Sequence, residues 1–280
     1  MILRVACLQL NARPHLDANL DEVEHFARQA AADGARFIAT PENTSGMYGS
    51  RSALIESVLP EPGHPGLARL TGLARETAAW LLVGSLSIRL DNGKLANRSF
   101  LIDPAGAVVA RYDKIHMFDS DPPDGQPYRE SATFEPGTRA VVADTPFGRL
   151  GLSICYDVRF PALYAELARA GAQMIAVPAA FTVPTGQAHW HVLLRARAIE
   201  TGTFVIASAQ TGEHAGGRRT YGHSLIVAPW GEILADGGES PGIVAAELDF
   251  ERVAAARRMI RSLDHSRPFL PALSEGKAFV

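Results

Sequence analysis

The chain lacks the features of disulfide-rich proteins, of membrane-spanning proteins and of proteins that bind nucleic acid or anionic membranes. It contains only two cysteines, Cys7 and Cys155, so it has no disulfide framework and fits a reducing compartment. No apolar run approaches the roughly 20 residues that span a bilayer, and Arg4 interrupts the short apolar stretch at the start of the sequence. The formal net charge of -3 gives no electrostatic reason to expect nucleic acid or an anionic membrane as a partner. These absences predict a cytoplasmic protein that binds neither nucleic acid nor membrane.

The sequence also lacks two familiar signatures of hydrolases. The G-x-S-x-G motif of serine hydrolases has no match, because "GLSIC" and "GHSLI" both lack the final glycine. The histidines of "AHWH", His189 and His191, are two residues apart on an expected helix, where such residues do not share a face. His189 and His191 are therefore poor co-ligands for a metal ion, and we expect neither a metal nor a cofactor.

The length and composition are those of an ordinary globular protein. The chain has 280 residues, of which 47% are apolar and 20% charged, so it can build one large core. We interpret residues 1–280 as a single domain. Its tail, from about residue 262, is rich in Pro, Ser and large apolar residues without periodicity. Phe269, Leu270 and Phe279 in this tail are expected to pack on the body or on a partner subunit.

Apolar runs with strand character alternate with amphipathic helical patterns along the chain. Strands at residues 80–90, 95–103 and 107–114, separated only by turns, indicate an antiparallel meander. Because roughly a dozen strands would make an overlong open sheet, we predict two sheets face to face with helices outside, an α/β fold of the α-β-β-α sandwich type. The other expected strands are 3–10, 36–43, 139–145, 149–155, 173–178, 203–210, 223–236 (a hairpin) and 242–249, and the expected helices are about 20–34, 65–77, 162–170, 188–200 and 250–261.

Three polar residues stand where predicted strands end, which is where ligands collect in layered α/β proteins. Glu42 follows "RFIATP", Lys114 follows "VVARYD" and Cys155 follows "RLGLSI". Acyl transfer from a carbon–nitrogen bond needs a thiolate that attacks, a carboxylate that moves protons and a cation that stabilises the oxyanion. We expect a helix N-terminus after Cys155, together with Lys114, to favour the thiolate. By position alone each residue also fits a non-catalytic role: Glu42 as a solvated glutamate, Lys114 as a surface lysine and Cys155 as a structural cysteine.

Three segments resemble the signature blocks of the nitrilase, or carbon–nitrogen hydrolase, superfamily and occur in its order: "ATPENTSG", "YDKIHMFD" and "GLSICYDVRFP". The resemblance implies an α-β-β-α fold with Glu42 as general base and acid, Lys114 stabilising the oxyanion and Cys155 as nucleophile. It also matches Glu130, in "YRESATFEPG", to the second active-site glutamate, which orients substrate and supports the lysine. A Cys–His enzyme that uses His116 is the weaker alternative, because the lysine and the glutamates would then have no role.

Two longer stretches are similar to the Nit-type amidase branch of this superfamily: "YDKIHMFDSDPPDGQPYRESATFEPG" and "FTVPTGQAHWHVLLRARAIETGTFVIASAQ". The resemblance implies a homodimer or larger homo-oligomer that hydrolyses deaminated glutathione or a similar short ω-amide through a cysteine thioester. His191 stands where this branch usually has glutamate. The alternatives that stay open are a nitrilase, an N-carbamoyl amide hydrolase and a non-catalytic scaffold with the same fold.

An anionic substrate of this kind needs a cation in addition to Lys114. Arg159 is one candidate, and Arg195 or Arg197 on the helix at 188–200 is another, because guanidinium can bind a carboxylate through two hydrogen bonds. Tyr156, directly after the nucleophile, would offer its backbone N–H to the oxyanion. The other candidates for the pocket wall, each after a strand or at a helix start, are Phe181, Thr182, His189 and Trp190.

Overall fold

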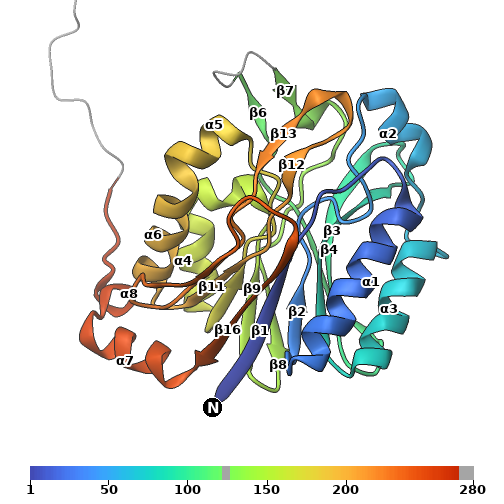
Figure 1. The fold of residues 1–280 in the computed structure, drawn as a ribbon. Coiled ribbons are helices and arrows are strands. Elements are labelled where there is room, and N and C mark those ends of the chain that lie inside the picture. Colours follow the sequence, from blue (N-terminus) through green and yellow to red (C-terminus); the bar gives the residue numbers. More distant parts are fainter. Residues whose placement is uncertain (122–126, 271–280) are drawn as a thin grey trace, which may run out of the picture.

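The computed structural model describes residues 1–121 and 127–270. Two six-stranded sheets lie face to face, and helices cover the outer face of each sheet (Figure 1). This four-layer α-β-β-α arrangement confirms the predicted fold class. Two further pairs of short strands lie at one end of the sandwich, outside the main sheets.

The first sheet has the strand order β16-β1-β2-β3-β4-β5. Strands β1, β2 and β3 are parallel, whereas β3, β4 and β5 form the predicted antiparallel meander. Helices α1 and α3 pack side by side on its outer face (Figure 1). The bounds are β1 Ile2–Gln9, β2 Phe37–Ala39, β3 Trp80–Arg89, β4 Leu95–Ile102, β5 Val108–Asp113, β16 Gly242–Asp249, α1 Leu16–Ala32 and α3 Pro65–Thr77.

The second sheet has the order β15-β14-β11-β10-β9-β8, with β9, β10 and β11 parallel. Strands β14 and β15 form the hairpin expected within residues 223–236. Helices α4 and α6 cover its outer face. The bounds are β8 Val141–Thr145, β9 Gly148–Leu152, β10 Met174–Ala176, β11 Phe204–Ala207, β14 Leu225–Val227, β15 Ile233–Asp236, α4 Pro161–Arg169, α5 Val183–Thr185, α6 His191–Thr201, α7 Glu251–Met259 and α8 Ser262–His265. A π-helical turn, Gly186–Trp190, joins α5 to α6.

Several short elements were not predicted, because they are too short or too polar to show a period. Helix α2 (Arg51–Ser57) buries none of its residues. Strand β6 (Asp119–Ser120) pairs with β7 (Tyr128–Arg129), and β12 (Thr211–Glu213) pairs with β13 (Arg219–Tyr221). These elements surround one end of the sandwich in Figure 1, where they form the rim of the pocket described below.

Alternate residues of strand β1 pack into two different hydrophobic cores. Its residues Leu3, Val5 and Cys7 pack between the two sheets, whereas Ala6 and Leu8 pack with the residues under α1 and α3. Successive strand residues point to opposite faces, so a strand that is covered on both faces reads as a continuous apolar run. This double burial explains why "LRVACLQL" shows almost no polar alternation.

The tail is described as far as residue 270. Arg169 on α4 donates to Ser266 Oγ at 3.0 Å, which ties the start of the tail to the body. Beyond that point Phe269 and Leu270 are 91% and 88% exposed, so within one chain they do not pack on the body. Their packing against a partner subunit stays a prediction, and Phe279 lies outside the described residues. In the described part of the chain, no helix has the length and apolarity to cross a membrane.

Gly84 in β3 allows the loop that carries Glu42 to approach closely. A Cβ at Gly84 would lie 2.1 Å from the carbonyl oxygen of Thr40 and 2.4 Å from that of Pro41. We therefore expect Gly84→Ala to lower the free energy of unfolding by about 1–3 kcal/mol, as overpacking does, and to reduce activity by displacing Glu42. Gly72→Ala on α3 is the control: it should raise stability by about 0.5–1 kcal/mol, because its Cβ would meet no atom closer than Arg75 Nη2 at 3.9 Å and alanine favours the helix. Urea unfolding measures the free energy of unfolding of both variants. Equal values for Gly84→Ala and Gly72→Ala would contradict the close approach inferred for Gly84.

Candidate active site

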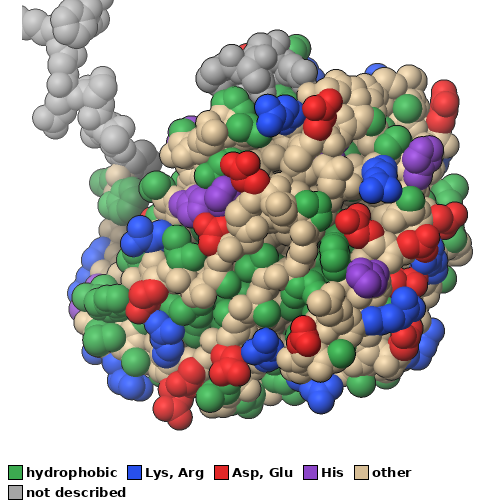
Figure 2. Space-filling model, in the orientation of Figure 1, with side chains coloured by type: hydrophobic (Ala, Val, Ile, Leu, Met, Phe, Trp, Pro, Cys, Tyr) green, Lys and Arg blue, Asp and Glu red, His purple; other side chains and the backbone are tan. Residues whose placement is uncertain are grey.

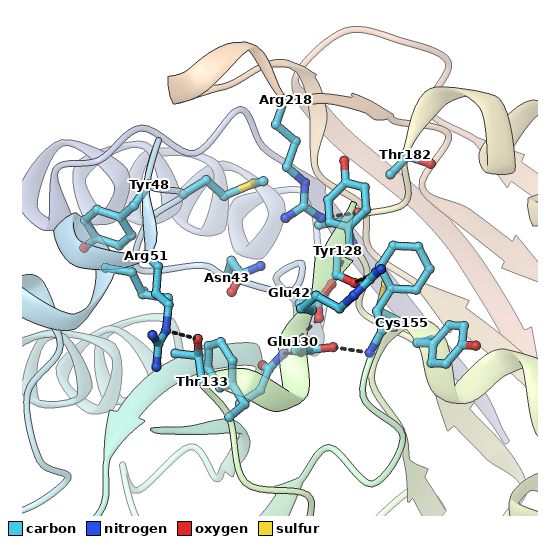
Figure 3. A pocket seen from close by; sticks show the side chains of 18 of the residues that line it. Glu42, Asn43, Tyr48, Arg51, Tyr128, Glu130, Thr133, Cys155, Thr182 and Arg218 are labelled. Atoms are coloured by element: carbon cyan, nitrogen blue, oxygen red, sulfur yellow. Dashed lines mark hydrogen bonds between the residues drawn. The ribbon is translucent and has the colours of Figure 1, made fainter. Parts of the chain in front are cut away.

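A pocket of about 400 Å³ opens at one end of the sandwich. The loops after β2, β5 and β9 bring Glu42, Lys114 and Cys155 into its wall, and Glu130 lines it as well. Figure 3 shows Glu42, Glu130 and Cys155 facing one another in its interior. The three residues predicted from separate sequence blocks, and the second glutamate, therefore meet in one place.

Cys155 lies on a sharp turn. Strand β9 ends at Leu152, and Cys155 is the first residue of a 3-10 helix, Cys155–Arg159, which leads into α4. Its φ of +49° lies in the left-handed region, which a residue with a side chain adopts only at an energetic cost. The backbone N–H of Cys155 donates to Pro178 O at 2.8 Å, and this bond holds the turn against the end of β10.

Glu42 is 3% exposed, and donors surround its carboxylate. Its Oε1 accepts from Lys114 Nζ at 3.0 Å and from Asn97 Nδ2 at 2.9 Å, while its Oε2 accepts from the backbone N–H of Ala180 at 3.0 Å. The thiol of Cys155 lies close enough to this carboxylate for each group to shift the pKa of the other. A buried carboxylate with this many donors is held in one orientation beside the sulfur.

Lys114 is 2% exposed and lies between two carboxylates. Its Nζ donates to Glu42 Oε1 at 3.0 Å and to Glu130 at 2.8 and 3.0 Å. Glu130 is held in turn by the backbone N–H of Phe118 at 2.6 Å. Taking one partner from a buried ion pair leaves an unpaired charge in a region of low dielectric, so these three side chains depend on one another.

Protonation states follow from these contacts. Burial acts to raise the pKa of Glu42, but the Lys114 ammonium and its hydrogen bonds bring that pKa below its ordinary value of 4.5. Burial acts to lower the pKa of Lys114, whereas the Glu130 and Glu42 carboxylates raise it above its ordinary value. Burial raises the pKa of Cys155 well above its ordinary value, and the Glu42 carboxylate raises it further. The expectation of a resting thiolate is therefore wrong: at neutral pH a thiol lies beside a charged carboxylate and a charged ammonium.

Asp157 connects the nucleophile turn to the segment that carries Lys114. It is fully buried, and its carboxylate accepts from Ile154 N at 2.8 Å, Tyr112 Oη at 2.7 Å and His116 N at 3.0 Å. The His116 ring bonds to the same carboxylate and does not line the pocket. This arrangement disfavours the Cys–His alternative, because the imidazole is already engaged away from the sulfur.

Four of the predicted substrate-binding residues line the pocket: Tyr156, Arg159, Phe181 and Thr182. The guanidinium of Arg159 lies 5.3 Å from the centre of the Phe181 ring and 5.9 Å from that of Tyr156. Stacking of this kind orients a guanidinium while leaving its N–H groups able to bind a carboxylate.

The remaining candidates do not line the pocket. Trp190 is fully buried behind Phe181, with its Nε1 donating to His223 O, and His189 is exposed, with its Nδ1 3.3 Å from Arg159 Nη1. Successive helical residues are about 100° apart, so only some residues at a helix start can face a ligand. Arg195 and Arg197 donate to the carbonyls of Gly231 and Val158, and these bonds tie α6 to neighbouring loops.

Sequence reasoning missed several residues of the pocket, among them Asn97 and Arg218. Asn97 donates to both Glu42 and Glu130, and the signal for it was a polar residue inside the buried strand "LANRSFLI". Arg218 points into the pocket from the loop before β13 (Figure 3), and its buried Nε has no hydrogen-bond partner among the described residues. Gly216 lets that loop approach Gly49, since a Cβ there would lie 2.8 Å from the Gly49 Cα.

Comparison with known proteins agrees with this geometry. Residues 4–258 match the carbon-nitrogen hydrolase family model. A deaminated glutathione amidase from Synechocystis sp. is 43% identical over 264 residues, covering 93% of this chain and 96% of that protein. Human omega-amidase is 35% identical, covering 98% of each chain. The crystal structure of the C. elegans NitFhit protein superposes with a TM-score of 0.89 at 34% identity, over 95% of this chain and 65% of that longer one. The chain therefore belongs to the carbon-nitrogen hydrolase family, in its Nit-type branch of amidases.

Proposed function

We propose that the chain hydrolyses an amide bond through a thioester on Cys155, with Glu42 as general base and acid and Lys114 as the oxyanion cation. The observation that carries this proposal is that the Cys155 thiol lines the same pocket as the hydrogen-bonded pair of the Glu42 carboxylate and the Lys114 ammonium. Glu130 positions Lys114 and the substrate, and Asn97 holds both glutamates.

In the first half of the reaction, Cys155 Sγ attacks the amide carbonyl carbon. The thiol proton passes to Glu42 as the S–C bond forms, so a free thiolate need not accumulate. The carbonyl oxygen becomes an oxyanion, and the Lys114 ammonium and the backbone N–H of Tyr156 stabilise it. The C–N bond then breaks, the leaving nitrogen takes the proton from Glu42, and ammonia or an amine departs.

In the second half, water attacks the thioester carbonyl carbon and gives a proton to Glu42. The C–S bond breaks, a carboxylic acid leaves, and Cys155 recovers its proton from Glu42. One carboxylate thus acts as base and then as acid in each half. The low pKa of Glu42 supports this role, because the group is ionised and able to accept a proton at neutral pH.

We also propose that the substrate is deaminated glutathione or a similar short ω-amide that carries a carboxylate. The names of the relatives support this, and so does the positive charge in the pocket, where Arg159 and Arg218 both lie. Arg218 is the stronger support, because its buried Nε lacks a partner within the described residues and a carboxylate would supply one.

A panel of amides and nitriles with and without a carboxylate tests the substrate class. We expect Arg159→Ala and Arg218→Ala each to raise KM for anionic amides by roughly 10- to 100-fold, the cost of a charge-assisted hydrogen bond, and to leave KM for neutral amides nearly unchanged. Arg195→Ala is the control and should change neither, because Arg195 bonds to Gly231 O away from the pocket. Equal effects on anionic and neutral amides would contradict the assignment, as would turnover of nitriles alone.

We further propose a cytoplasmic homodimer. Val192 and Ile199 on α6, and Trp230 in the β14–β15 turn, are exposed large apolar side chains on the side of the second sheet. Exposed apolar residues on neighbouring elements favour a protein–protein contact. Both cysteines are free thiols, which fits a reducing compartment.

A further inference from the structure

Three side chains outside the pocket meet on the surface of the second sheet. His191 is the first residue of α6, His223 precedes β14, and Asp236 is the last residue of β15. One ligand atom from each lies within 4.8 Å of the other two. Figure 2 shows histidine side chains gathered beside acidic ones on this face of the molecule. None of the three residues lines the pocket, so the reaction proposed above leaves the cluster without a role.

The two imidazoles lie within hydrogen-bonding distance of different oxygens of the Asp236 carboxylate. His191 Nε2 lies 3.0 Å from Asp236 Oδ2, and His223 Nδ1 lies 2.8 Å from Asp236 Oδ1. The side chains are 20% to 34% exposed, so a small ion can reach them from solvent. In the described part of the chain no lysine or arginine pairs with Asp236, and the carboxylate has no permanent cation beside it.

Neighbouring groups hold the cluster in place. His223 has φ +53°, a left-handed conformation that is unfavourable for a residue with a side chain, and its ring stacks on Tyr221 at 4.4 Å. Asp236 Oδ1 also accepts from the backbone N–H of Gly238 at 2.9 Å. Such outer contacts orient the ligands of metal sites in proteins.

We propose that His191, His223 and Asp236 bind one divalent transition metal ion of the zinc type. Two imidazoles and one carboxylate are a common three-residue donor set for this ion, with water in the remaining position. Donors of a tetrahedral zinc lie about 3.3 Å apart. The nitrogen–oxygen separations of 2.8 and 3.0 Å are close to this value, and one ligand atom from each of the three residues lies within 4.8 Å of the others, so side-chain movements can bring the set around one ion. On binding, each ligating nitrogen offers its lone pair, and the imidazole proton resides on its other ring nitrogen.

The ion would act as a structural clamp. It would join the start of α6 to the β14–β15 hairpin, which are 32 to 45 residues apart in sequence. Trp190, next to His191, bonds to His223 O and packs on Phe181 of the pocket wall. The clamp thus lies behind the pocket wall, and its failure would leave the proposed reaction intact. It also departs from our expectation of no metal, which considered His191 only with His189.

Competition between the chelator-treated full-length chain and a chromophoric chelator for Zn²⁺ tests the proposal. We expect one Zn²⁺ per chain and an affinity that falls at least ~10-fold in His191→Gln, His223→Gln and Asp236→Asn, since even outer-shell changes cost that much. At the same zinc concentration, zinc should also raise the melting temperature of the native chain more than that of the three variants. Circular dichroism without metal establishes that each variant is folded, and Asp236→Asn, the smallest change, keeps the shape of the side chain.

Two control variants locate the ion. His25→Gln removes an exposed histidine on α1, and Cys155→Ala removes the pocket thiol; both should bind Zn²⁺ as the native chain does. The Co²⁺-loaded chain should show a visible spectrum without the charge-transfer band that a thiolate ligand adds. The proposal is overturned if the native chain takes up no stoichiometric Zn²⁺, if the three variants bind it as tightly as the native chain, or if Cys155→Ala abolishes binding.

Discussion

Cys155→Ala should lower turnover of every amide by a factor on the order of 10⁴ or more, because removing a nucleophile leaves only binding and oxyanion stabilisation. The protein should fold as before, since Cys155 and alanine differ by one sulfur atom in a turn that Pro178 and Asp157 hold through the backbone. Initial rates on the best substrate of the amide panel, with the melting temperature as the check on folding, measure the effect.

Cys7→Ala is the matched control, because it removes the other thiol of the chain. Cys7 is buried between the two sheets, burial raises its pKa to about 12, and it does not line the pocket. We expect normal kcat and KM with a loss of roughly 1 kcal/mol of stability, as for other small deletions in a core. A Cys155→Ala enzyme that keeps a tenth of the native activity would contradict the account, and so would loss of activity in Cys7→Ala.

Glu42→Gln should lower kcat by about 10²- to 10⁴-fold, the usual contribution of general acid–base catalysis. The amide keeps the size of the carboxylate but cannot accept a proton at neutral pH. It also cannot accept hydrogen bonds on both sides, whereas Glu42 accepts from Lys114 and Asn97 on one oxygen and from Ala180 on the other.

A second measurement separates this role from a purely structural one. The Glu42 carboxylate raises the pKa of Cys155, and Lys114 lowers it. Removing the negative charge should therefore shift the pH profile of Cys155 alkylation by iodoacetamide to lower pH, while turnover falls. Glu61→Gln is the control, because Glu61 pairs with Arg98 and Arg111 away from the pocket, and neither measurement should change. Slow turnover with an unshifted alkylation profile would indicate a displaced loop instead of a lost base.

The sequence was informative where one local feature determines the outcome. Turns between apolar runs predicted the β3–β4–β5 meander, which follows from strand periodicity. Polar residues after strands marked Glu42, Lys114 and Cys155 as candidates, and the resemblance of their three segments to the nitrilase superfamily predicted that they would meet in one pocket.

Properties that depend on several distant segments were not predictable in this way. The charge state of Cys155 was wrong because it depends on burial and on the nearby Glu42 carboxylate, which a view restricted to the following helix and Lys114 omits. Arg218 was missed because its loop reaches the pocket only through a close approach to Gly49, far away in the sequence. Trp190 was assigned to the pocket for its place at a helix start, whereas the turn of the helix directs it into the core.

The most direct test of the account is a mass measurement of the acyl-enzyme. The native chain is mixed with a substrate amide, quenched in acid within the first turnovers and digested for peptide mapping. We predict that the peptide containing Cys155 gains the mass of the acyl group, that the adduct decays as the acid product forms, and that the peptide containing Cys7 is unmodified. Amide turnover without any adduct on Cys155, or an adduct on another residue, would contradict the thioester mechanism.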